Sequence, residues 1–172
     1  MALIWRDAAR EDRHLLQGFR CTIDHTRNRD GRPLFHPRPW EHELQSYLRR
    51  MTPPSGADQR LRLGLDVSEK LMGVSEQVRI ETVGSIAVVK LQALAISVDA
   101  RGQGGQVADL TLADALIRSA DLAHETGASE ALVIGWVDPR NQASKGLLTR
   151  AGFNRRGNAP GGLEDWAIVI EP

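Results

Sequence analysis

The chain has 172 residues, 41% of them hydrophobic and 26% charged, and its 22 basic and 22 acidic residues cancel to a net charge of zero. This composition is that of an ordinary globular domain, and it excludes a disordered, collagen-like or membrane-spanning chain. A chain without net positive charge has no electrostatic footprint for nucleic acid, so we expect neither nucleic acid nor a membrane as a partner.

The first half of the chain predicts a strand, two helices and then two more strands. Apolar residues recur at helical spacing at first, and from Leu61 onward they alternate with a period of two, so that Leu61, Leu63 and Leu65 share one face. A polar segment with three prolines, over 22–39, separates the two helices and is expected to be a surface loop. The expected elements are a strand over 3–6, helices over 7–20 and 40–51, and strands over 61–67 and 71–80.

The second half predicts a strand–helix–strand unit, a further helix and a hairpin. A long apolar run over 86–98 is typical of a central strand covered on both faces, and a helical period that starts at Gln106 ends at Gly127, a favourable helix stop. The remaining elements are a strand over 132–137, a helix over 141–151, and hairpin strands over 153–156 and 166–170. This order predicts a single α/β domain over 1–172, with a mixed central sheet of six or seven strands flanked by four helices.

The cysteine and histidine content limits the chemistry. Cys21 is the only cysteine, which excludes an intrachain disulfide framework and favours a reducing, cytoplasmic compartment. No cysteine–histidine cluster has the spacing of a zinc site, so we expect no metal. The start of the chain lacks the basic and apolar segments of a secretory signal, and this also favours the cytoplasm.

A glycine-rich segment, Arg101-Gly102-Gln103-Gly104-Gly105-Gln106, joins the long apolar run to the following helix. The first turn of a helix presents backbone N–H groups without intrahelical partners and a partial positive charge. Glycines allow a phosphate to approach the backbone closely. The segment is therefore a candidate phosphate cradle, to which Arg101 adds a charged donor. A plain tight turn is the alternative, since the spacing matches neither the P-loop nor the dinucleotide-binding pattern.

Two segments carry a resemblance to a known family. The apolar strand over 94–98 followed by Asp-Ala-Arg-Gly-Gln-Gly-Gly resembles the acetyl-coenzyme A signature of the GCN5-related N-acetyltransferases (the GNAT family), which reads Arg/Gln-x-x-Gly-x-Gly/Ala. Downstream, Asn141 and Ser144 followed by Gly152-Phe153 are similar to that family's Asn-x-x-Ser segment. The resemblance covers residue 61 to the C-terminus. It implies the GNAT acyl-coenzyme A N-acyltransferase fold and direct transfer of an acetyl group from acetyl-coenzyme A to an amine.

The resemblance also implies roles for single residues. Backbone groups of Leu94 and Ile96 would bind the pantetheine arm, and the glycine-rich segment would hold the pyrophosphate through its N–H groups. Asn141 and Ser144 would face the pantetheine and the thioester. The residues expected to bind the cofactor are Leu94, Ile96, Arg101, Gly102, Gln103, Gly104, Gly105, Gln106, Asn141 and Ser144.

The general acid is left open. Many members of the resembled family carry a tyrosine four residues after the serine, as the acid for the leaving thiolate, but this sequence has Leu148 there. The only tyrosine is Tyr47, on the second predicted helix. Ser144 and Tyr47 are therefore the candidate catalytic acids. A thiol pKa of about 8.5 makes the need for an acid modest.

The general base is equally open. Alternation places four residues of the central strand on one face, and neither face carries a carboxylate; these four are Lys90, Gln92, Leu94 and Ile96. His42 is the candidate catalytic base, because a histidine pKa of about 6.5 suits that role and the second helix borders the acceptor site in the resembled family. His36 and Glu81 are alternatives.

Two functions of different classes remain open. The first is an N-acetyltransferase that acts on a small-molecule or peptide amine. The second is an acyl-coenzyme A-binding or interaction module of the same fold with little or no transferase activity, which the missing tyrosine and strand carboxylate motivate. A nucleotide-binding α/β domain is a third alternative. The acceptor depends on segments without a transferable motif, and a homodimer, common in the family, is left undecided.

Overall fold

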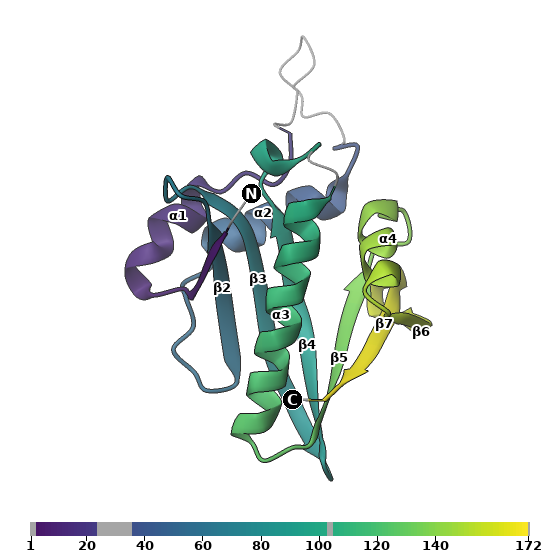
Figure 1. Ribbon diagram of the computed structural model, residues 1–172. Coiled ribbons are helices and arrows are strands. Elements are labelled where there is room, and N and C mark those ends of the chain that lie inside the picture. The colour runs from purple at the N-terminus through teal and green to yellow at the C-terminus, as the bar shows by residue number, and fades with distance from the viewer. Residues whose placement is uncertain (1–2, 24–35, 103–104, 172) are drawn as a thin grey trace.

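The computed structural model describes residues 3–23, 36–102 and 105–171. Within these ranges seven strands form one mixed sheet in the order β1-β2-β3-β4-β5-β7-β6 (Figure 1). The strands are β1 (Ile4–Asp7), β2 (Gln59–Leu65), β3 (Leu71–Val83), β4 (Ile86–Ile96), β5 (Glu130–Val137), β6 (Asn154–Ala159) and β7 (Leu163–Ile170). The α-helices are α1 (Arg13–Gly18), α2 (Pro39–Arg50), α3 (Gln106–Glu125) and α4 (Gln142–Arg150). No helix of the described ranges is long and apolar enough to cross a membrane.

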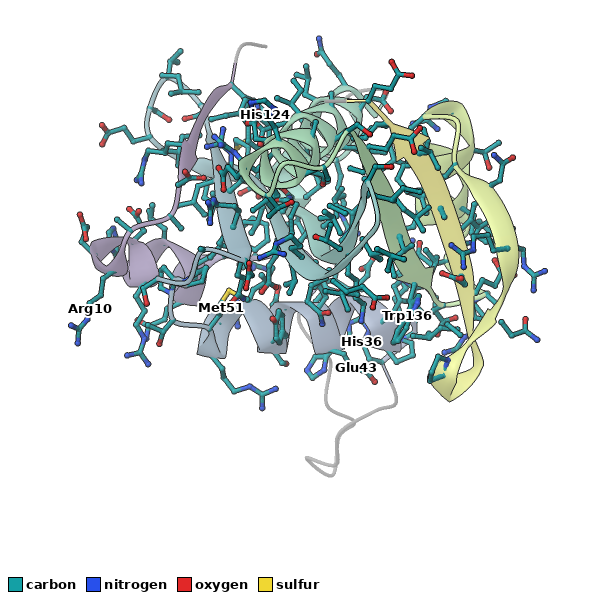
Figure 2. The ribbon with its side chains drawn as sticks, turned by 90° about the horizontal axis from the view of Figure 1, so that it is seen from below. Arg10, His36, Glu43, Met51, His124 and Trp136 are labelled. Atoms are coloured by element: carbon teal, nitrogen blue, oxygen red, sulfur yellow. The ribbon has the colours of Figure 1, made fainter. Side chains whose placement is uncertain are left out.

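The helices cover the two faces of the sheet. α1 and α2 lie on one face and α3 on the other, as the two views show (Figures 1 and 2). The α2 side is closed by a cluster that includes Leu16, Leu48 and Leu63, and the α3 side by one that includes Leu112 and Val133. Burial of these apolar side chains is the main source of stability. Neighbouring strands are antiparallel except β4 and β5, which are parallel and joined through α3. The predicted fold class is confirmed.

The first helix is shorter than predicted. A 3₁₀ turn over Arg10–Asp12 replaces its first half, and α1 follows it. Asp12 is the cause, because its carboxylate accepts a hydrogen bond from Ala9 N at 2.8 Å and binds the Arg6 guanidinium on β1 at 2.6 Å. Both partners precede the helix and lower the pKa of Asp12. These bonds tie the segment to the sheet edge and delay the start of α1.

A bulge interrupts β4 at Gln92. Glu76 of β3 lies opposite Ala93, whereas Gln77 lies opposite Leu91, so Gln92 has no partner across the ladder. An extra residue reverses the alternation of faces beyond it. Leu91 therefore packs on the α3 side, while Ala93 packs on the α2 side.

The bulge overturns one prediction about β4. Leu94 and Ile96 pack on the α3 side, next to Leu91 and Val107. The sequence pattern places them on one face with Lys90 and Gln92. That prediction is wrong, because simple alternation takes no account of a bulge.

The sheet opens between β4 and β5. Their parallel pairing runs from Ile86–Glu130 to Leu91–Gly135 and then stops. Beyond that point the two strands diverge, with α4 beside β5 on the far side of the opening (Figure 1). The opening begins at the bulge, so the bulge residue and the last paired residues lie at its inner end.

Candidate functional site

Two cavities meet in the opening between β4 and β5. One, of about 440 Å³, extends to the start of α3, where Arg101, Gly102 and Gly105 line it; we call it the α3 cavity. The other, of about 380 Å³, is lined by Tyr47 and Trp136, and we call it the Trp136 cavity. The two cavities adjoin, because six residues line both: Trp40, Leu44, Leu94, Asn141, Ser144 and Leu147.

The β4 edge presents free backbone groups to this opening. Ser97 N donates to Met72 O of β3 at 2.8 Å, and hydrogen-bonded pairs alternate along an antiparallel ladder. The register therefore makes Ala95 bond to β3 and turns the N–H and C=O groups of Leu94 and Ile96 away from β3. They point to the side from which β5 has diverged, and both residues line the α3 cavity. An amide-bearing ligand arm could pair with this edge as a further strand would.

The start of α3 has the geometry of an anion site. Gly105 is the N-cap with φ +82°, and no described side chain caps the helix there. Gly102 is also left-handed, with φ +79°, and Gln106 is the exposed first residue of the helix. The open N–H groups of the first turn and the helix dipole favour a phosphate at this point. Gln103 and Gly104, the other predicted residues, lie outside the described ranges.

The arginine beside the start of α3 is not the predicted one. The Arg101 guanidinium donates to the Cys21 carbonyl and forms an ion pair with Glu41 at 3.1 Å, so it ties the loop to α2 rather than facing the helix start. Arg150 of α4 instead lies beside Gly105 and pairs with Asp109 at 2.7 Å. Sequence reasoning missed Arg150, because nothing local indicates that α4 ends near the start of α3.

Asn141 and Ser144 form the start of α4. The side chain of Asn141 caps the helix, with Oδ1 accepting from Ser144 N at 3.1 Å. Its Nδ2 donates to Ser144 Oγ at 2.8 Å. Since Oγ accepts from Asn141, the hydroxyl proton of Ser144 is available to a second partner. Both residues line the two cavities, so the structure brings together the predicted Asn–Ser pair and the β4 edge.

Replacing Asn141 by alanine is expected to lower the free energy of unfolding by about 1 kcal/mol, the usual value of an N-cap. Asn141→Asp keeps the capping oxygen and loses only the donor to Ser144, so it should unfold like the wild type. Urea unfolding of the two variants measures both effects. Equal stability of the alanine variant and the wild type would contradict the capping role.

A buried carboxylate lies behind the Trp136 cavity. Glu76 of β3 has 0% exposure. Its Oε2 accepts from the Tyr47 hydroxyl at 2.8 Å, and its Oε1 accepts from the Gln59 amide. Burial raises the pKa of Glu76, although both donors and Lys90 oppose this. Burial and the Glu76 carboxylate raise the pKa of Tyr47. Sequence reasoning missed Glu76; the available signal was an acidic residue in phase with the apolar Val74.

Trp136 lines this side of the cavity, and Lys90, which does not line it, lies against the Trp136 ring. Lys90 Nζ lies 3.6 Å from the centroid of the Trp136 ring, a cation–π contact. Burial lowers the pKa of Lys90, and Glu76 opposes the shift. Trp136 is 39% exposed, and Figure 2 shows it with Glu43 on the α2 side of the sheet, opposite His124 on the α3 side. The wall is therefore aromatic, with one cation and one buried anion next to it.

His42 lies away from the opening, whereas Leu148 and Cys21 are buried. His42 is exposed, stacks on His36 at 5.6 Å and lines neither cavity, so the structure does not bring it to the opening. Leu148 is buried and lines the Trp136 cavity. Burial raises the pKa of Cys21 to about 11, which keeps its thiol protonated at neutral pH. Among the described residues no group of three His, Cys, Asp or Glu could hold a metal ion.

No family model and no curated protein matches the sequence. Solved structures match it over almost its whole length. An acetyltransferase of the GNAT family from Streptococcus pneumoniae is 20% identical with a TM-score of 0.56, and the match covers 98% of this chain and 100% of that one. The GNAT domain of PAT from S. lividans is 16% identical with a TM-score of 0.60, covering 98% and 90%. Spermidine N-acetyltransferase from Vibrio cholerae, in complex with CoA and spermine, is 16% identical with a TM-score of 0.57, covering 98% and 95%.

This likeness shows that the chain has the fold of the GNAT acetyltransferases. It confirms the fold expected from the glycine-rich segment and the Asn-x-x-Ser spacing. The match is one of shape, at 16–20% sequence identity.

Proposed function

We propose that this protein is a GNAT-family N-acetyltransferase that binds acetyl-coenzyme A in the α3 cavity and transfers the acetyl group to an amine in the Trp136 cavity. One observation carries the proposal. The helix start at Gly105, the β4 edge and Ser144 all line the α3 cavity, and Ser144 also lines the adjoining aromatic Trp136 cavity. A long ligand with an anionic end and an amide-bearing arm fits this order of groups.

The residues of the α3 cavity suit each part of acetyl-coenzyme A. The pyrophosphate would bind at the first turn of α3, with Arg150 as the nearby cation. The two peptide units of the pantetheine arm would pair with the free groups of Leu94 and Ile96. The thioester would then lie near Ser144, where the two cavities join.

Ser144 is the proposed proton donor to the leaving thiolate. Its hydroxyl is held by Asn141 and keeps its own proton for a second partner. Loss of such an acid has a modest effect, because the thiol pKa is about 8.5 and correct positioning supplies much of the rate. The transfer is direct. The protonated, buried Cys21 is unsuited to carry the acyl group, and this thiol is the only one in the chain.

The Trp136 cavity favours an amine with an apolar or aromatic body. Trp40, Tyr47 and Trp136 line it, together with the carboxylates of Glu43 and Asp138. Among the described residues that line it there is no lysine or arginine. Aromatic faces and carboxylates attract an ammonium group before it loses its proton. A small-molecule amine or a peptide N-terminus fits these walls, and a cytoplasmic location is part of the proposal.

The acyl-coenzyme A-binding module remains the second candidate. Leu148 favours it, because a buried leucine occupies the slot of the family's usual acid. Both candidates bind coenzyme A, and they differ in turnover.

Calorimetry with coenzyme A, followed by release of free thiol from acetyl-coenzyme A with an amine panel, tests the proposal. The panel contains spermidine, 2-phenylethylamine and a short peptide with a free N-terminus. Saturable binding with amine-dependent thiol release supports the enzyme. Binding without turnover supports the module, and absence of binding contradicts both.

A further inference from the structure

Glu76 is a buried titratable group to which the proposed transfer assigns no role. It has no exposed surface, and both of its oxygens accept hydrogen bonds, from Tyr47 on α2 and Gln59 on β2. A buried carboxylate is costly unless its charge is balanced and hydrogen-bonded. The charged or titratable groups that face Glu76 are Tyr47 and Lys90 of β4, while β2 contributes the neutral Gln59. All three partners favour the ionised form.

The other carboxylates that line the Trp136 cavity lie in different surroundings. Asp138 is held by Arg140 at 2.7 and 2.9 Å, and the pKa of Asp138 is lowered by these bonds. Glu43 is exposed at the cavity wall. Burial instead raises the pKa of Glu76, and a carboxylate with a raised pKa is a better proton acceptor.

Tyr47 connects Glu76 to the cavity. Its side chain lines the cavity, and its hydroxyl gives its proton to the hydrogen bond with Glu76 Oε2 at 2.8 Å. The lone pairs of the Tyr47 oxygen are therefore the groups left to accept a hydrogen bond from an amine in the cavity. An amine donor in the cavity and the Glu76 carboxylate behind Tyr47 are therefore placed as the two ends of a proton relay.

Resting on the proposed function, we propose that Tyr47 takes the proton of the attacking amine and passes its own phenolic proton to Glu76. The amine nitrogen bonds to the carbonyl carbon as the N–H proton moves to Tyr47 Oη and the O–H proton moves to Glu76 Oε2. Collapse of the tetrahedral intermediate breaks the C–S bond, and the thiolate takes a proton from Ser144 or solvent. Tyr47 is neutral before and after, because Glu76 returns its proton to the Tyr47 oxygen as the Tyr47 hydroxyl releases one to solvent in the cavity. Where Ser144 supplied the thiolate proton, it takes one back from solvent. Tyr47 is the catalytic residue, and Glu76 positions it and receives its proton.

The pH profile of kcat/KM tests the relay, with the panel amine that the wild type uses fastest. Tyr47→Phe and Glu76→Gln should each lower kcat about 100-fold, in the range of a general base. Glu76→Gln should also remove the acidic limb of the profile, because the base must be ionised to act. Gln59→Ala should keep the limb and move it to higher pH, because Glu76 loses a donor that favours its ionised form. A purely structural role of Glu76 would change kcat without moving this limb.

The matched control is Glu11→Gln, the same change at an exposed position that lines neither cavity. It should keep the wild-type profile, and coenzyme A affinity should be equal in all variants, because none of these residues lines the α3 cavity. If Glu76→Gln fails to fold, Gln59→Ala and Tyr47→Phe still test the relay. A wild-type acidic limb in Gln59→Ala, or kcat within twofold of the wild type in Tyr47→Phe, overturns the relay alone. A wild type that binds coenzyme A without turning over any amine overturns the transferase and the relay together.

Discussion

Replacing Gly105 with valine is expected to weaken the binding of coenzyme A at least about tenfold while the protein stays folded. Gly105 has φ +82°, a left-handed conformation that costs a residue with a side chain roughly 1–2 kcal/mol, and more when it is β-branched. Space is not the obstacle, since a Cβ would meet Arg150 and Asp109 only at 3.6 and 3.9 Å. The backbone therefore gives way, and the first N–H groups of α3 turn from the direction of the phosphate. Calorimetry measures the change in affinity, where tenfold corresponds to about 1.4 kcal/mol.

Gly127→Val is the matched control for this variant. Gly127 lies just beyond the other end of α3, with φ +74° and nothing within 4 Å of an added Cβ. It carries the same conformational cost and lies far from the opening along the 20-residue helix. Both variants should unfold at lower temperature, and only Gly105→Val should lose affinity. Equal affinities in the two variants would show that the helix start takes no part in binding.

The order of the elements can be predicted from local patterns alone. Period-two alternation marks β2 and β3, and a glycine at each end marks α3. The bulge at Gln92 cannot be predicted in this way, because it lies inside an apolar run that reads as continuous alternation. It forms where β4 must pair with β3 on one edge and part from β5 on the other, and β5 follows β4 in the sequence only after the whole of α3. That one inserted residue determines which side chains of β4 reach each face.

The candidate site likewise has features that local sequence patterns predict and features that depend on tertiary packing. The glycine-rich segment and the pair Asn141 and Ser144 are local patterns, since each marks the start of a helix, and the structure places Gly102, Gly105, Asn141 and Ser144 beside the opening. The contact between Glu76 and Tyr47 is not local, because the two residues are 29 positions apart and become neighbours only when α2 packs on the sheet. The sequence favours His42 as the base, but the orientation of α2 decides otherwise: the Tyr47 hydroxyl reaches Glu76 of the sheet, whereas His42 is exposed.

Replacing Asp114 with alanine is expected to destabilise the protein by about 3 kcal/mol, the range for breaking a buried ion pair by removing one partner. Arg62 of β2 donates to both oxygens of Asp114 on α3 at 2.9 Å, and the two side chains are 9% and 13% exposed. Loss of the carboxylate leaves the guanidinium buried with Asp7 at 3.2 Å as its remaining acidic partner, and that carboxylate is half exposed. The bridge fixes α3 on the sheet, so urea unfolding should report the loss directly.

Asp109→Ala in the same helix separates burial from charge. Asp109 also pairs with an arginine, Arg150, at 2.7 Å, but both side chains are half exposed or more. Exposed pairs contribute less than about 1 kcal/mol, because water screens the charges and two long side chains lose freedom. The two alanine variants remove the same group from one helix, so their difference measures what desolvation of Arg62 adds. Similar losses for both would mean that α3 is held by its apolar face alone and that the buried bridge does not anchor it.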